Sequence, residues 1–88
     1  MALLKKRGEW IAAKNRIEGK HEREALAKFI GDPGWRDDAI RKLRKETPAF
    51  KGKRIEEIIE FIWENKDTWL PVLISLITAL MLTENETE

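Results

Sequence analysis

The side chains in this sequence that could take part in chemistry are carboxylates at helical spacing. Glu56, Glu60 and Glu64 recur every four residues, so a helix would place them along one line of its surface. Such a row could bind a cation or act in acid/base catalysis. A solvated acidic face is the more common reason for the pattern, and we take it as the main interpretation.

Cysteine and histidine chemistry is supported even less by the sequence. The sequence has no cysteine, which excludes disulfides, thiolate zinc sites and a cysteine nucleophile. His21 is the only histidine, so no metal-ligand spacing of two histidines exists, and we expect it on a helix surface. We therefore expect a protein that is not an enzyme, with no catalytic, cofactor-binding or metal-binding residues and no small-molecule substrate.

Positive charge is concentrated in the first part of the chain. Residues 1–54 carry 16 Lys and Arg against 8 Asp and Glu, whereas residues 55–88 carry 1 Lys against 8 acidic residues. Such asymmetry suggests that the basic part meets an anionic partner, although solvated helix faces are the alternative. The candidate residues for binding anionic lipid or nucleic acid are Arg41, Lys42, Arg44, Lys45, Lys51, Lys53 and Arg54.

Proline and glycine signals divide the chain into four helical segments. In the first, residues 2–30, apolar positions repeat every seven residues, which gives a narrow apolar face. Gly8 and Gly19 favour a bend or break. We expect a long helix that is exposed or bound to a partner rather than a core helix. The candidate protein-partner contacts are Trp10, Ile11, Ile17 and Trp35.

The next two segments have clear helix signals. Asp32 before Pro33 predicts a capped helix start, and Thr47 before Pro48 predicts its end near Glu46. The third helix, about residues 53–65, has a face that must be buried. That face consists of Ile55, Ile58, Ile59 and Ile62.

The last segment contains the run WLPVLISLITALML, residues 69–82, which has no charged side chain. A helix over residues 68–83 would be about 24 Å long, short of a hydrocarbon layer of about 30 Å. Its apolar residues surround the helix on every side, all Lys and Arg precede Asp67, and Trp63 and Trp69 stand where the helix begins. These three features favour a membrane, whereas the length favours a buried helix. The candidate residues for membrane contact or helix packing are Trp69, Leu70, Leu73, Ile74, Ile77 and Leu80.

The predicted fold class is all-α without β-sheet: extended helices joined by Pro/Gly turns, with a short C-terminal helix that is transmembrane or deeply buried. We divide the chain into a basic helical region (1–54), an amphipathic interfacial helix (55–67), an apolar anchor helix (68–83) and an acidic tail (84–88). Leu3 and Leu4 are followed at once by basic residues, so we expect no secretory signal.

This organisation is similar in outline to small membrane-anchored accessory subunits, such as those of membrane complexes or membrane-containing phage particles. The N-terminus is then expected in the cytoplasm or virion interior and the C-terminus on the far side. Expected partners are membrane lipid and proteins of a larger or homo-oligomeric assembly. One alternative is a soluble helical assembly protein with a buried C-terminal helix, whose basic half binds nucleic acid or protein. A phage lysis protein is another.

Overall fold

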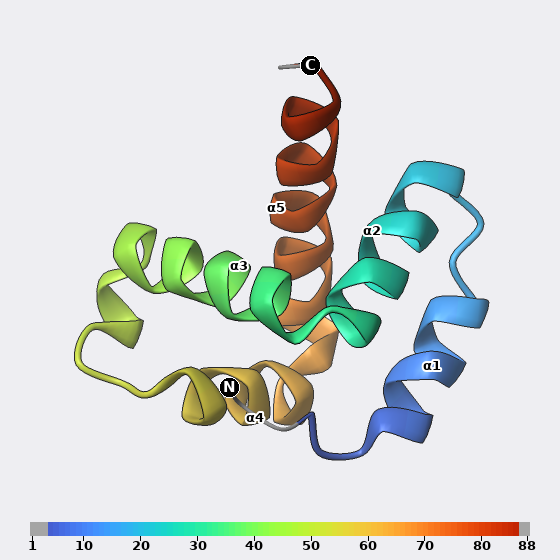
Figure 1. Ribbon diagram of the computed structural model, residues 1–88. Helices are drawn as coiled ribbons and strands as arrows, with labels where there is room; N and C mark the ends of the chain where they lie inside the picture. Colours follow the sequence, from blue (N-terminus) through green and yellow to red (C-terminus); the bar gives the residue numbers. More distant parts are fainter. Residues whose placement is uncertain (1–3, 87–88) are drawn as a thin grey trace.

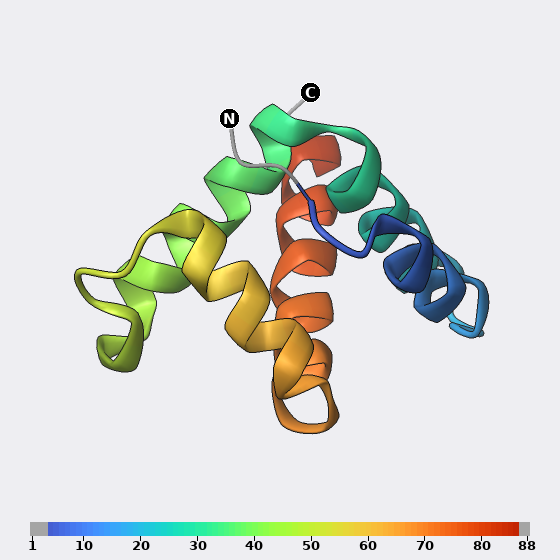
Figure 2. The same ribbon diagram turned by 90° about the horizontal axis from the view of Figure 1, so that it is seen from below.

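A computed structural model describes residues 4–86 of the chain. Its elements are α1 (Arg7–Asn15), α2 (Lys20–Gly31), α3 (Pro33–Glu46), the 3₁₀ helix η1 (Pro48–Phe50), α4 (Ile55–Glu64) and α5 (Lys66–Glu86). No strand occurs among the described residues, which confirms the all-α fold class. Helix α5 runs through the middle of the bundle and is crossed by α3 (Figure 1). Seen from below, α4 lies on one side of α5, and α2 and α1 lie on the other (Figure 2).

A break was expected near Gly8 or Gly19 and is present at Gly19, whereas the expectation of a long, exposed or partner-bound helix over residues 2–30 is wrong, because the chain folds back there. An unbroken helix of that length would measure about 43 Å, whereas the greatest extent of the molecule is 32 Å. The break lies between α1 and α2, where Gly19 is in an extended conformation (φ −66°, ψ 127°). This reversal lets α1 and α2 pack against each other, so both become core helices.

The predicted boundaries of α3 are confirmed, with the expected local chemistry. The side chain of Asp32 accepts a hydrogen bond from the backbone N–H of Trp35 (3.1 Å), and Pro33 occupies the first turn. Thr47 leaves the helical conformation before Pro48 (φ −119°, ψ 103°). The chain then forms η1, buries Phe50 and turns at Gly52, whose φ of +81° suits a residue without a Cβ.

Helix α5 supplies the central stripe of the hydrophobic core. Leu73, Ile77 and Met81 recur every four residues and are buried, the first two completely. They lie in one core with residues of all the other helices, and α5 contacts α2, α3 and α4. The apolar helix is therefore partly enclosed by the chain itself. Helix packing, one of the two roles expected for its residues, takes place within the folded bundle.

Helix α5 is also longer than predicted. It has 21 residues and extends from Lys66 to Glu86, so it includes the first three residues of the expected acidic tail; the last two lie outside the described residues. At 1.5 Å per residue this gives about 32 Å. By length and composition, α5 is one helix among the described residues that could cross a membrane. The added residues Lys66, Asp67, Glu84 and Glu86 are charged, so the uncharged part of the helix is still residues 68–83, and the shortfall in its apolar length stays a prediction.

Aromatic side chains connect the ends of the core. Trp10 lies between two rings: its centroid is 4.6 Å from that of Trp63 and 5.5 Å from that of Phe29. On the other side, Phe50 contacts Trp69 at 4.9 Å between ring centroids. Tilted ring pairs at these separations add stabilisation beyond the burial of their surface.

One buried charge holds the C-terminus of α2. The guanidinium of Arg36, 3% exposed, donates hydrogen bonds to the carbonyl oxygens of Phe29 (3.1 Å) and Ile30 (3.0 Å). Arg7 of α1 donates a further hydrogen bond to the Ile30 carbonyl (3.0 Å). Carbonyls in the last turn of a helix have no partner within the helix, so these arginines satisfy them. Burial lowers the pKa of Arg36 from its ordinary value, while the neighbouring carboxylate of Asp37 opposes that effect.

The core position of α5 gives a test by paired substitutions. Ile77→Ala should lower the free energy of unfolding by about 2 to 5 kcal/mol, because it leaves a cavity at a fully buried site. Val72→Ala, on the same helix but 44% exposed, should cost less than about 1 kcal/mol. Chemical denaturation followed by circular dichroism measures both. Equal, small losses would contradict the central position of α5.

Candidate functional site

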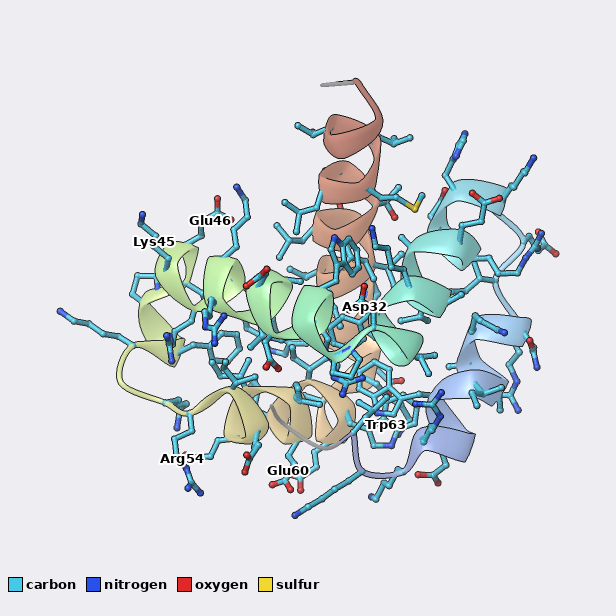
Figure 3. All side chains as sticks on the ribbon, in the orientation of Figure 1. Asp32, Lys45, Glu46, Arg54, Glu60 and Trp63 are labelled. Carbon is cyan, nitrogen blue, oxygen red and sulfur yellow. The ribbon has the colours of Figure 1, made fainter. Side chains whose placement is uncertain are left out.

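The predicted anionic-partner residues lie together at one end of the molecule, which we call the basic end. It consists of Arg41, Lys42, Arg44, Lys45, Lys51, Lys53 and Arg54. All are exposed except Arg44, which is half-buried. With Glu46 as the one acidic residue between positions 41 and 54, the formal charge of this segment is +7 − 1 = +6. Lys45 at the end of α3 and Arg54 before α4 mark its two edges (Figure 3).

Two contacts fix the linker beside α3. The side chain of Phe50 is 1% exposed and holds η1 against the core. The guanidinium of Arg44 donates a hydrogen bond to the backbone carbonyl of Lys53 (3.2 Å), nine residues further along the chain. The linker lysines are therefore held next to the last turns of α3, and the fold gathers two charge clusters that the sequence separates.

The cations of the basic end differ in their partners. Arg41 pairs with Asp38 (2.9 Å) and Arg54 pairs with Glu57 (3.0 Å), both on the surface. Exposed pairs of this kind contribute about 0 to 1 kcal/mol, so they do little to hold the arginines in place. The remaining four exposed cations make no ion pair with a described side chain; they are Lys42, Lys45, Lys51 and Lys53.

This arrangement suits contact with phosphate groups through point charges. Lysine ammonium groups attract phosphate without the planar two-point geometry of arginine. Phe50 is the one aromatic residue between positions 41 and 54, and it is buried. Phe61 of α4 packs edge-on against Phe50, with 5.5 Å between ring centroids, and is 36% exposed. Base stacking, which single-stranded nucleic acid binding normally uses, would depend on this partly exposed ring beside the basic end.

A second surface lies on the side of α5 that the bundle leaves uncovered, and we call it the α5 outer face. Its exposed residues are Thr68, Pro71, Val72, Ser75, Ala79, Leu82 and Thr83. None of them is charged, and Val72 and Leu82 are 44% and 37% exposed. The outer faces of α3 and α4 carry charged residues instead, such as Lys42 and Glu57. The α5 outer face is thus unusual within this protein.

The sequence-based residues of the apolar helix lie mostly on the opposite, inner side. Leu73 and Ile77 are completely buried, while the others are half-buried and pack against the core; these are Trp69, Leu70, Ile74 and Leu80. Sequence reasoning missed the outer face because all sides of the helix are similarly apolar. The sequence does contain one signal for this face, which is the absence of charged residues at positions such as Ser75 and Ala79.

The predicted protein-partner residues do not form an exposed surface. Trp10 is 1% exposed and Trp35 is 9% exposed, so the expectation that both contact another protein needs correction: their rings are used inside the chain. Ile11 and Ile17 are half-buried and pack against the same core. For Trp10, Ile11 and Ile17 the break at Gly19 explains the difference, because it folds α1 onto α2. Trp35 is buried by the packing of α3.

The acidic row of α4 and His21 complete the list of candidate chemical groups. Glu56 and Glu64 are exposed and Glu60 is half-buried, and His21 is exposed on α2. No group of three or more Asp, Glu or His side chains arranged to hold a metal occurs within residues 4–83.

The geometry of the basic end predicts that its free lysines are not needed for folding. Replacing Lys42, Lys45, Lys51 and Lys53 by Gln should change the free energy of unfolding by less than about 0.5 kcal/mol per site, because each side chain is exposed. Arg44→Gln should cost more, because it removes the hydrogen bond to the Lys53 carbonyl. Urea denaturation compares the variants. A large loss in the lysine variant would assign these residues a structural role.

Comparison with known proteins adds no further information about the site. No protein-family model, curated protein or solved structure matches the chain.

Proposed function

We propose that this protein is a non-enzymatic accessory protein that associates with a membrane. The observation that carries the proposal is the α5 outer face, an uncharged and exposed surface on a helix that is long and apolar enough to cross a membrane. A water-exposed helix face normally carries charged or polar residues, and large apolar surfaces mark contact sites. Lipid is the partner that such a helix fits by length and composition.

The basic end supports the same proposal through electrostatics. A lysine or arginine near an anionic bilayer surface gains about 1 kcal/mol. Four exposed lysines without ion pairs are therefore sufficient to favour binding to a membrane that contains anionic lipid. Headgroup phosphates need no base-stacking ring, in contrast to single-stranded nucleic acid.

The bundle binds at the membrane surface in this proposal. A full crossing by α5 would require Leu73 and Ile77 to leave the core, because both are completely buried against the chain. Whether the protein is surface-bound or spanning then depends on which is larger, the free energy of the core contacts of α5 or that of its contacts with lipid. In a spanning state, the distribution of Lys and Arg favours an N-terminus in the cytoplasm and a C-terminus on the far side.

The electrostatic part is tested by binding to vesicles of phosphatidylcholine with and without phosphatidylserine. Replacing Lys42, Lys45 and Lys51 by Gln should weaken binding to the anionic vesicles by roughly 100-fold, from about 1 kcal/mol for each charge. The matched control replaces Arg16, Lys20 and Arg23, which are exposed and distant in sequence from the basic end. Equal losses in the two variants would show that net charge alone matters. Stronger, equally sensitive binding to duplex DNA would favour the nucleic-acid alternative.

The apolar part is tested by a single charge on the α5 outer face. Ala79→Glu should weaken vesicle binding by about tenfold or more, because charged residues in the apolar region of a bilayer are strongly penalised. Ala12→Glu on α1 is the matched control, since Ala12 is also exposed within a helix. Co-sedimentation with vesicles measures both, and an alkaline carbonate wash separates surface binding from spanning. A change in oligomeric state without a change in vesicle binding would assign this face to protein contact instead.

A further inference from the structure

Three aromatic rings meet where η1, α4 and α5 come together, and we call them the aromatic cluster. It consists of Phe50, Phe61 and Trp69. The ring centroids of Phe50 and Phe61 are 5.5 Å apart, those of Phe50 and Trp69 are 4.9 Å apart, and those of Phe61 and Trp69 are 5.9 Å apart. Each ring therefore contacts the other two. Tilted ring pairs at such distances stabilise one another, so the cluster is a fixed feature of the fold.

The aromatic cluster extends from the core to the surface. Phe50 is 1% exposed, Trp69 is half-buried and Phe61 is 36% exposed. Phe61 is thus one of the large apolar side chains that the fold leaves in contact with water. The other three tryptophans of the chain are buried. Trp69 is therefore the indole that can meet an external partner without a change of the fold.

One edge of the aromatic cluster borders the linker of the basic end. Lys51 directly follows Phe50 in the sequence. The backbone N–H of Lys53 donates a hydrogen bond to the carbonyl of Phe50 (3.0 Å), which ties the linker back onto the residue that anchors it. Exposed ammonium groups are therefore held beside a partly exposed aromatic surface.

The acidic residues of α4 leave this edge largely free of negative charge. Glu57, one turn before Phe61, pairs with Arg54 (3.0 Å). Glu60 and Glu64 line a cavity together with Trp63. At 3.6 residues per turn, Trp63 lies about 160° around the helix from Phe61, so this cavity is on the other side of α4.

The other edge of the aromatic cluster continues into the α5 outer face. Val72 follows Trp69 by three residues, so the two side chains are neighbours on one side of the helix, and Val72 is 44% exposed. Leu76, seven residues after Trp69, extends the same line and is half-buried. An apolar surface therefore runs from Phe61 across Trp69 and along α5.

We infer that Phe61 and Trp69 insert together at the boundary between the headgroups and acyl chains of an anionic bilayer. The linker lysines then contact headgroup phosphates, and the α5 outer face lies against the acyl chains. This inference rests on the proposed membrane association and adds the orientation of the protein on the bilayer. It names Phe61, which the sequence did not single out, as a residue that contacts lipid.

The order of chemical groups along this surface matches the order of layers in a bilayer. Positive charge suits the anionic headgroups, aromatic rings are enriched at the boundary below them, and an apolar helix face is buried about 5 to 10 Å into that boundary. Lysine side chains can place their apolar stems along the boundary and their charges in the headgroup layer. A single-stranded nucleic acid would use the lysines and Phe61 but would leave the α5 outer face in water.

The depth of Trp69 is tested with vesicles of phosphatidylcholine and phosphatidylserine that carry bromine on their acyl chains. Bromine quenches the fluorescence of an indole that it contacts, and the other three indoles are buried. Bromine close to the headgroup should quench more strongly than bromine near the methyl end, because the ring lies at the boundary. Trp69→Phe should abolish the quenching. Co-sedimentation with the same vesicles measures how much of the chain is bound.

Substitutions of Phe61 test its contact with lipid. Phe61→Ser should weaken vesicle binding by about tenfold, because it removes an exposed apolar ring. Phe61→Leu is the matched comparison and should lose less affinity, since it keeps an apolar side chain. Circular dichroism verifies that each variant is folded. The quenching measurement uses the parent chain, so it decides the matter even where Phe61→Ser does not fold.

The outcomes separate this inference from the membrane association on which it rests. Vesicle binding without quenching of Trp69 would overturn the inference alone, and so would unchanged binding by Phe61→Ser. Equal losses in Phe61→Ser and Phe61→Leu would overturn it as well, because the ring would then serve packing only. A parent chain that does not bind vesicles would remove both proposals. Tighter binding to single-stranded DNA, with the same loss in Phe61→Ser, would assign the aromatic cluster to base stacking instead.

Discussion

Burial of one stripe of α5 is the constraint on which the rest of the structure depends. A chain of 88 residues has little interior, so its stability rests on a small number of fully enclosed apolar side chains. Leu73 and Ile77 are two of these, and three helices contact the element that carries them. Helix α1 reaches the same core through α2 and through the contact of Trp10 with Trp63. The positions of α2, α3 and α4 are thus set by a common surface, the inner side of α5.

The same helix also explains why the protein has an uncovered apolar surface. An ordinary bundle helix is apolar toward the core and polar toward water. Helix α5 is apolar toward the core and uncharged toward water, so the bundle uses only part of its hydrophobic surface. Leu73 and Ile77 are used by the core, whereas Val72 and Leu82 can meet an external partner while the bundle stays intact. The proposed surface-bound state therefore requires no change of the fold.

The opposite charges of the two parts of the chain become local surfaces in the fold. The turn at Thr47 and Pro48 and the hydrogen bond from Arg44 to Lys53 collect the cations of α3 and its linker at the basic end. The acids of α4 instead lie beside the segment before α1, where Lys5 pairs with Glu60. Because α4 carries an apolar face next to its acidic row, it borders both the core and a charged surface. The overall charge of +1 conceals these separate sites.

Sequence by itself determined the helical class and most helix boundaries. These features depend on local chemistry: Asp32 before Pro33 starts a helix, and Thr47 before Pro48 ends it. The cations of the basic end could be listed from the sequence, but the contact of Arg44 with Lys53 brings their two clusters together. Tertiary structure alone decided which side of α5 is buried, because a helix that is apolar all round carries no directional signal. It also decided the place of Trp10, which depends on the reversal at Gly19 and on a partner ring 53 residues away. Contacts between residues far apart in the chain are set by the packing of whole helices, and no local pattern encodes them.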